Sequence, residues 1–180
     1  MIWRLAKYFD EGRDNIQIGD NKNAVDYVYV GNAATAHVLA ADRLFDDPDK
    51  VAGEVFFITN GSPVRQWDFH RMFYKEFGRH KQRRVVRIPF IVALIMAFLV
   101  EVFCKIAGMK SEFNRFAVRY LTTAQWYNIN KVWFVFFADN CLNVGQARSR
   151  LGYEPQVSLA EGVKRAVGWW RQRRNVGYQI

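Results

Sequence analysis

The chain has 180 residues, of which 51% are hydrophobic and 16% aromatic, so it can form a domain with a real core and an intrinsically disordered chain is excluded. Its 26 basic residues outnumber 17 acidic ones, for a formal charge of +9, which indicates attraction to an anionic partner such as nucleic acid, phosphate or a membrane surface. The two cysteines form no C-x-x-C motif, so they support neither a disulfide framework nor a zinc site.

Helix and strand patterns alternate from the first residues onward. Helical spacing predicts a helix over Ile2–Phe9, and because the chain runs directly into this amphipathic segment we expect no signal peptide there. β-Branched and aromatic residues predict a strand over Val25–Val30. A helix over Ala33–Phe45 follows, with Asn32 as its expected N-cap.

A second strand and helix come next. The continuous apolar run within Glu54–Thr59 is typical of a strand that is buried on both faces. A turn over Asn60–Pro63 then leads into a helix that ends near Gly78. Strands that alternate with helices in this way predict an α/β fold.

The most apolar run of the chain is Ile88–Val100, and basic residues precede it. A membrane-spanning helix needs about 20 apolar residues, so three alternatives stay open. The run is a buried helix under a substrate pocket, an anchor that lies at a membrane surface, or a marginal span.

The last predicted element is a helix near the C-terminus. Ser158 followed by Glu161 forms a capping-box pattern, and apolar residues recur at helical spacing as far as Trp170. Basic residues at its C-terminal end suit the helix dipole, so we interpret them as a solvated helix end.

Several motifs of catalytic and nucleotide-binding proteins are absent from the sequence. It contains no G-x-G-x-x-G, G-x-x-G-x-x-G, Walker-A, G-x-S-x-G or H-E-x-x-H pattern, and its three histidines are scattered. We therefore predict no catalytic, cofactor-binding or metal-binding residue in this chain. Tyr127 and Lys131 do match Tyr-x-x-x-Lys, a spacing that puts both side chains on one helix face, but we interpret this pair as a chance match.

Eight segments carry a resemblance to a known family. In chain order they are Gln17–Asn21, Asp26–Asn32, Ala36–Ala41, Gly53–Asn60, Trp67–Phe69, Leu151–Pro155, Val157–Gly162 and Trp169–Trp170. Together they resemble the 3β-hydroxysteroid dehydrogenase family of extended short-chain dehydrogenases, and within it the branch that decarboxylates sterols at C4.

The resemblance implies a fold and a function. The chain would be the C-terminal, substrate-side part of a Rossmann-type domain, a single portion over 1–180 with an incomplete parallel sheet and packed helices. The family oxidises a 3β-hydroxyl to a ketone with NAD or NADP. Its glycine-rich loop and catalytic Tyr-x-x-x-Lys lie upstream of the matched segment, so neither can be carried onto a residue here, and we expect this portion to be inactive alone.

What the resemblance does carry over is the substrate side. It implies Asn21, Asn23, Asp26, Tyr27 and Tyr29 as substrate-binding residues. Packing within a strand is an equally good interpretation of the two tyrosines, because alternate strand residues face opposite sides.

Residues 132–146 interrupt the family pattern. The family would place Ala147 soon after Lys131, and the intervening residues are unusually aromatic. A retained short intron is one interpretation of this segment, and a genuine strand or loop insertion is the other.

Three functions remain open from sequence alone. The first is the substrate portion of a sterol dehydrogenase, acting on a sterol or steroid at the endoplasmic reticulum membrane, peripherally or on its cytoplasmic face, with other sterol-pathway enzymes as candidate partners. The second is a non-catalytic remnant of the same fold. The third is a non-catalytic basic module that associates with a membrane through Ile88–Val100. Nucleic acid ranks lowest as a partner, because aromatic and basic residues do not interleave on one strand face.

Overall fold

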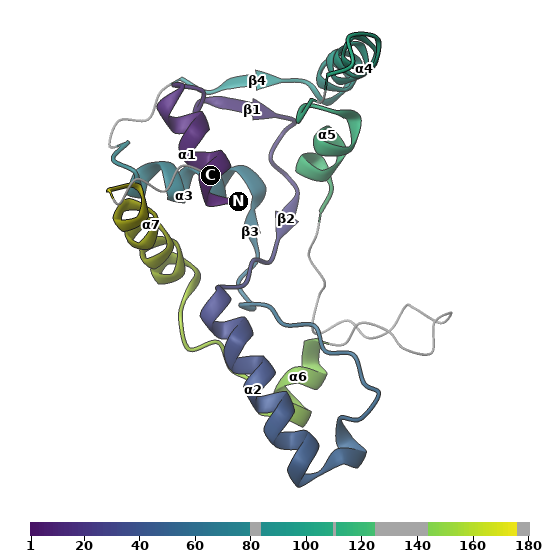
Figure 1. Cartoon of the computed structure of the whole chain (residues 1–180), viewed down its shortest axis with the longest axis vertical. Coiled ribbons are helices and arrows are strands. Elements are labelled where there is room, and N and C mark those ends of the chain that lie inside the picture. The colour runs from purple at the N-terminus through teal and green to yellow at the C-terminus, as the bar shows by residue number, and fades with distance from the viewer. Residues whose placement is uncertain (80–83, 110, 125–143, 176–180) are drawn as a thin grey trace. The chain divides into compact units, whose positions relative to one another are not determined.

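The computed structural model describes residues 1–79, 84–109, 111–124 and 144–175, which form seven α-helices, a 3₁₀ helix and four short strands (Figure 1). In chain order the elements are α1 (Ile2–Asp10), β1 (Ile16–Ile18), β2 (Ala24–Val25), α2 (Val30–Asp46), η1 (Pro48–Lys50), β3 (Val64–Arg65), α3 (Gln66–Glu76), β4 (Val86–Ile88), α4 (Phe90–Ile106), α5 (Arg115–Thr122), α6 (Val144–Leu151) and α7 (Leu159–Asn175).

The chain divides into two compact units. Unit 1 comprises Met1–Val25, Val64–Gln125 and Ala166–Ile180, and unit 2 comprises Asp26–Pro63 and Trp126–Arg165. The expectation of one substrate-binding portion over 1–180 concerns function and stays a prediction.

Two strand pairs organise unit 1. β1 pairs with β4 in parallel, with Ile16 opposite Val86 and Ile18 opposite Ile88. β2 pairs with β3 in antiparallel fashion. Figure 1 shows β1 and β4 side by side, with α4 and α5 beyond one end of the pair. The parallel pair and its helices confirm the expected α/β class.

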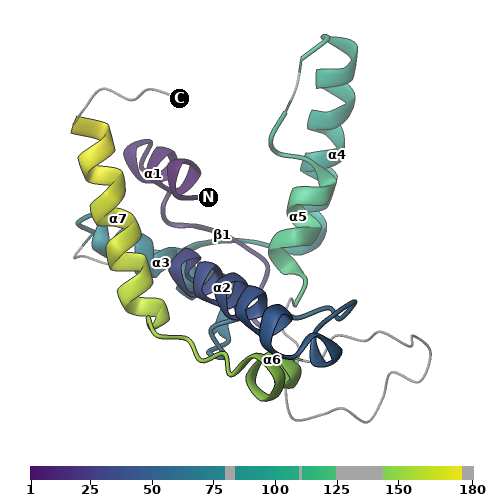
Figure 2. The same cartoon turned by 60° about the horizontal axis from the view of Figure 1, so that its bottom comes forward.

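Unit 1 has two apolar clusters. In the first, Ile18 packs with Val118 of α5 and with Ala93 and Ala97 of α4. The small alanine side chains let α4 pack closely against α5. The second is aromatic and joins α1, α3 and the end of α7, where Trp3 lies 6.2 Å from Trp169 and Phe77 lies 5.0 Å from Trp170; Figure 2 shows α1 beside α7.

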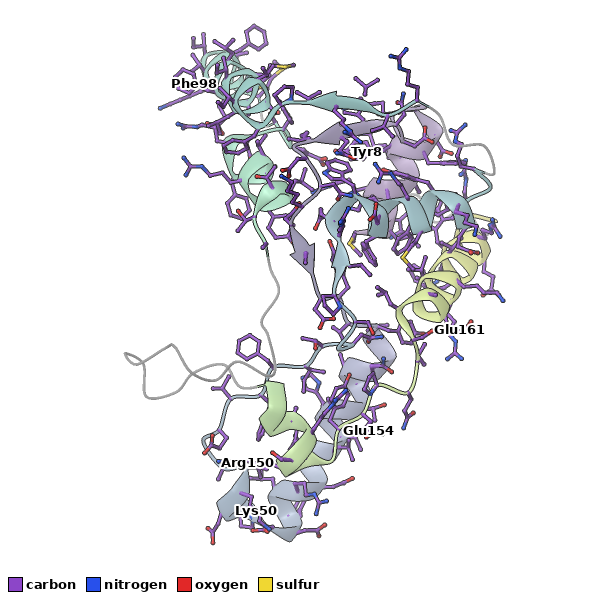
Figure 3. All side chains as sticks on the ribbon, turned by 180° about the vertical axis from the view of Figure 1, so that it is seen from behind. Tyr8, Lys50, Phe98, Arg150, Glu154 and Glu161 are labelled. Atoms are coloured by element: carbon purple, nitrogen blue, oxygen red, sulfur yellow. The ribbon has the colours of Figure 1, made fainter. Side chains whose placement is uncertain are left out.

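Unit 2 packs α2 against α6 around Ala36, Ala147, Leu151 and Tyr153 (Figure 2). Outside this cluster, the Arg150 side chain donates to the Lys50 carbonyl at 3.0 Å, and both residues are labelled in Figure 3. Unit 2 therefore combines a small apolar core with hydrogen bonds outside that core.

Both long predicted strands are wrong. Of the predicted strand Val25–Val30 only Val25 is strand, as the last residue of β2, because β3 offers a partner of just two residues. Glu54–Thr59 has no strand. A buried parallel strand needs neighbours along both edges, and no strand of the described residues pairs with this segment. Its Phe56 and Ile58 pack instead on the α2–α6 cluster.

The predicted helices are confirmed, with shifted boundaries. α2 begins at Val30, so Tyr29 is its N-cap residue and the prediction of Asn32 as cap is wrong. The capping box at α7 is confirmed in part, because Glu161 N donates to Ser158 Oγ at 3.3 Å whereas the Glu161 carboxylate accepts from Arg165 at 2.8 Å. The basic end of α7 is more than a solvated end, since Arg174 pairs with Asp10 at 3.2 Å.

The apolar run became α4, and only Ala93 and Ala97 of this helix are buried. A buried helix is therefore the wrong alternative for Ile88–Val100. None of the helices within the described ranges has the length and hydropathy needed to cross a bilayer. Tyr127, Lys131 and most of the suspected insertion, residues 132–143, lie outside the described residues; Val144–Gln146 begin α6.

Candidate functional site

A pocket lies at the carboxyl ends of β1 and β4 in unit 1. Parallel strands end at the same edge of a sheet, and this edge is where α/β proteins usually bind ligands. The pocket is open to solvent and has a volume of about 660 Å³. Its wall is made by Gly19, Asp20, Asn23, Arg87, Ile88, Pro89, Phe90, Thr122 and Thr123.

The loop after β1 is shaped by its backbone. Gly19 N donates to the Ile88 carbonyl at 2.9 Å, which extends the ladder beyond the last strand residue. Gly19 has φ +76°, and a Cβ built there would lie 3.1 Å from Thr122 Cγ2. A glycine is needed here both for the left-handed backbone and for the close approach of α5.

Asn21 holds this loop onto α3. It has φ 60°, a conformation that asparagine tolerates better than most residues. Its Oδ1 accepts from Trp67 N at 2.9 Å, one of the free amides at the start of α3, and its Nδ2 donates to Asp68 at 3.1 Å. Because its oxygen and nitrogen both bond to protein, the geometry gives Asn21 a positioning role, and its contact with substrate stays a prediction.

Asn23 belongs to the pocket itself. Its Nδ2 donates to the carbonyls of Leu121 at 3.0 Å and Thr123 at 3.3 Å, which ties the loop to the end of α5. Within the described part of the chain no donor bonds to Asn23 Oδ1. This oxygen can therefore accept a hydrogen bond from a hydroxyl in the pocket.

The other three predicted substrate residues lie in unit 2. Asp26 accepts from Ser62 N at 3.3 Å, and Tyr27 is half-buried. The Tyr29 ring packs against two glycines, since a Cβ on Gly31 would lie 2.6 Å from Cε1. The five residues are thus divided between the units, and packing accounts for Tyr29.

Two opposite charges line the pocket. The Asp20 carboxylate lies 3.4 Å from Lys22 Nζ and accepts from Lys22 N at 3.1 Å. The hydrogen bond from Lys22 N lowers the pKa of Asp20, so the group is ionised at neutral pH. No carboxylate of the described residues forms an ion pair with Arg87.

A polar network supports the strand under the pocket. Arg71 of α3 donates to Asp68 and to Gln17 of β1, each at 2.6 Å. Gln17 is buried and its Nε2 donates to the Gly19 carbonyl at 3.0 Å. The network fixes the carboxyl end of β1, and with it one side of the pocket.

The described residues do not fit a dinucleotide. A pyrophosphate requires a glycine-rich turn between a strand and a helix. β4 is joined to α4 by Pro89 alone, and Gly19 leads from β1 to β2 rather than to a helix. The same residues contain no group of three or more His, Cys, Asp or Glu that could hold a metal ion.

Sequence reasoning missed part of the pocket. Arg87, Thr122 and Thr123 line it, yet none was predicted to bind substrate. The pairing of β1 with β4 brings Arg87 beside Gln17, and a three-residue strand after a basic stretch gives too weak a pattern to predict that pairing.

Comparisons with known proteins agree on one family. The sequence model of the "3-beta hydroxysteroid dehydrogenase/isomerase family" matches residues 1–90. Similar relatives are the decarboxylating sterol-4-alpha-carboxylate 3-dehydrogenases of Schizosaccharomyces pombe and Saccharomyces cerevisiae, each 34% identical, over 92% and 88% of this chain and 44% and 41% of theirs. The 3beta-hydroxysteroid-dehydrogenase/decarboxylase isoform 2 of Arabidopsis thaliana is 31% identical over 87% of this chain and 26% of its own.

A solved structure is similar in fold. The crystal structure of gox2253 superposes with a TM-score of 0.58 at 18% identity, covering 94% of this chain and 43% of that one. The chain thus spans less than half the length of these relatives and of this structure.

Proposed function

The chain belongs to the 3-beta hydroxysteroid dehydrogenase/isomerase family, and from this premise we propose that it is the substrate-side portion of an NAD(P)-dependent dehydrogenase that oxidises the 3β-hydroxyl of a sterol or steroid. The relatives named as decarboxylating sterol dehydrogenases favour the branch that acts on sterols with a C4 carboxylate. A ketone at C3 turns such a substrate into a β-keto acid, which loses CO₂ readily.

The pocket at the carboxyl edge of β1 and β4 is the observation that carries this proposal. Ile88, Pro89 and Phe90 form an apolar wall, and Asn23, Thr122 and Thr123 add polar groups. A sterol needs this combination, because a large apolar skeleton carries few hydrogen-bonding groups. In this proposal the portion binds and orients the substrate and has no activity alone.

A sterol-binding titration tests the proposal. Dehydroergosterol is a fluorescent 3β-hydroxysterol, and we expect it to bind the chain saturably and to accept energy from Trp67, which lies at the start of α3. Asn23→Leu, which removes the pocket amide, should weaken binding, whereas Asn114→Asp at the N-cap of α5 keeps the capping acceptor and should not. Absence of saturable binding contradicts the proposal, and NAD⁺ reduction by the chain alone contradicts the statement that it is only a portion.

A membrane surface is the second proposed partner, and the exposure of α4 favours it. Most apolar side chains of this helix are exposed, among them Ile91, Ile95 and Phe103, and side chains project around the labelled Phe98 in Figure 3. Arg84 and Arg87 precede the helix and Lys105 lies in its last turn. Apolar residues with flanking cations suit the surface of an anionic bilayer, for which we propose the cytoplasmic face of the endoplasmic reticulum.

Vesicle flotation tests the membrane proposal. The chain should float with vesicles that contain phosphatidylserine, and less with phosphatidylcholine alone. Phe103→Ser should reduce flotation several-fold, because Phe103 is 63% exposed on α4. Phe45→Ser is the matched control, since Phe45 is 90% exposed on α2. Equal loss with both variants contradicts a specific role for α4.

A further inference from the structure

Arg87 occupies a distinct position in the pocket. It lies at the middle of β4, in register with Gln17 of β1, and it lines the pocket next to the apolar residues Ile88 and Phe90. Gln17 is uncharged, and its side chain already forms hydrogen bonds with Arg71 and with the Gly19 carbonyl. Arg87 is exposed, and it is the only basic residue among those that line this pocket.

The negative charge in the pocket is already balanced by another residue. Asp20 is the only acidic lining residue, and its two oxygens contact Lys22, one at the ammonium and one at the backbone amide. Asp20 thus has a cationic partner in the exposed Lys22, whereas the described residues offer Arg87 no carboxylate partner. A pocket whose lining combines one basic residue with apolar residues suits an amphipathic anion.

We propose that Arg87 recognises the carboxylate of the sterol substrate and thereby sets the preference for carboxylated over uncharged sterols. This inference rests on the proposed function and adds a residue and a chemical group to it. A planar guanidinium binds a carboxylate through two parallel hydrogen bonds, a geometry that a lysine ammonium does not reproduce. The sterol rings then lie along Ile88, Pro89 and Phe90, with Asn23 and the two threonines available to a hydroxyl group.

A pair of sterols measures this preference directly. The probes are 4α-carboxy-5α-cholestan-3β-ol and 4α-methyl-5α-cholestan-3β-ol, delivered to the chain from cyclodextrin without vesicles, so that α4 has no bilayer to bind. The wild-type chain should bind the carboxylated sterol at least about tenfold more tightly, which corresponds to one charge-assisted hydrogen bond. Arg87→Gln should abolish that ratio while affinity for the methyl sterol changes less than about twofold. Arg87→Lys should restore part of it.

Arg84→Gln is the matched control. It removes one positive charge three residues earlier in the chain, at an exposed residue that does not line the pocket, and the ratio should stay at its wild-type value. Equal effects of the two arginine variants, or a wild-type ratio near one, overturn the role of Arg87 and leave sterol binding intact. If neither sterol binds the wild-type chain, the role of Arg87 and the proposed function fail together.

Discussion

The two units stabilise their irregular backbone in different ways. In unit 1 the loop after β1 lies between a parallel strand pair and helices, and its polar contacts involve the charged residues Asp68 and Arg71. In unit 2 the described residues contain no strand. Hydrogen bonds from side-chain amides stabilise the irregular backbone there instead. Asn32 and Asn60 bond to each other at 2.9 Å, and both donate to the Val157 carbonyl.

Because their polar contacts differ, the two units should be destabilised by different changes. Unit 1 contains a buried histidine, His70, whose Nδ1 has no hydrogen-bond partner in the described structure. The amide network of unit 2 contains no group that titrates in the physiological range. Acid should therefore destabilise unit 1 first, whereas loss of an amide should destabilise unit 2.

The largest predicted effect is the pH dependence of unit 1. Burial, and then the charge of Arg71, lower the pKa of His70 from 6.5 to about 4. The unfolded chain binds this proton more readily than the folded one, so stability is fully present above pH 6.5 and is lost as the pH falls towards 4. We expect a loss of about 3 kcal/mol in the free energy of unfolding across that window, measured by hydrogen exchange of α3 amides.

Two variants isolate the histidine. His70→Gln should flatten the pH dependence of the unfolding free energy measured at α3 amides. His37→Gln, at an exposed residue of α2, should leave that pH dependence unchanged. If the unfolding free energy measured at α2 amides depends on pH as steeply, the prediction that acid destabilises unit 1 first is contradicted.

The second prediction concerns the amide network of unit 2. Asn32→Ala removes the acceptor of Val157 N, which donates to Asn32 Oδ1 at 3.0 Å, and leaves that half-buried amide unpaired. We expect the free energy of unfolding of unit 2 to fall by about 2 kcal/mol, seen as faster exchange in α2 and α6. Asp42→Ala, on the exposed surface of the same helix, should change little. Equal destabilisation of α1 and α3 would mean that the units do not respond separately.

The smallest predicted effect compares two glycines of α7. A Cβ at Gly162 would lie 2.9 Å from the Tyr29 ring, whereas a Cβ at Gly168 meets nothing within 4 Å. Gly162→Ala should destabilise by about 1.5 kcal/mol through overpacking, and Gly168→Ala should stabilise by about 0.5 kcal/mol through helix propensity. Chemical denaturation measures both changes. Tyr29→Ala should remove most of the Gly162 penalty; a penalty that persists contradicts the packing role of Tyr29.

Sequence patterns predicted five of the seven helices in the described residues, missed α5 and α6, and failed for the strands. The hydrogen bonds of a helix form within one segment, so the spacing of apolar residues was sufficient to predict α1, α3 and α7. Strand hydrogen bonds need a partner, and neither Val25–Val30 nor Glu54–Thr59 has a long one within the described residues. The opposite error is β4, whose three residues give almost no pattern and yet pair with β1.

The candidate site could be predicted only where it is local in sequence. The resemblance implied Asn21 and Asn23 as substrate-binding residues, and Asn23 does line the pocket. Arg87 and Thr122 reach the same pocket from segments more than 60 residues further along the chain. Their convergence depends on strand pairing and on the packing of α5, which no spacing in the sequence specifies.

The most direct test of where this chain binds its ligand is an NMR titration with 4α-carboxy-5α-cholestan-3β-ol. We predict saturable shifts of the backbone amides of Gly19, Asn23, Ile88, Thr122 and Thr123 in unit 1. Saturable shifts confined to unit 2 residues such as Asp26 and Tyr29, with the carboxyl ends of β1 and β4 unaffected, would contradict it.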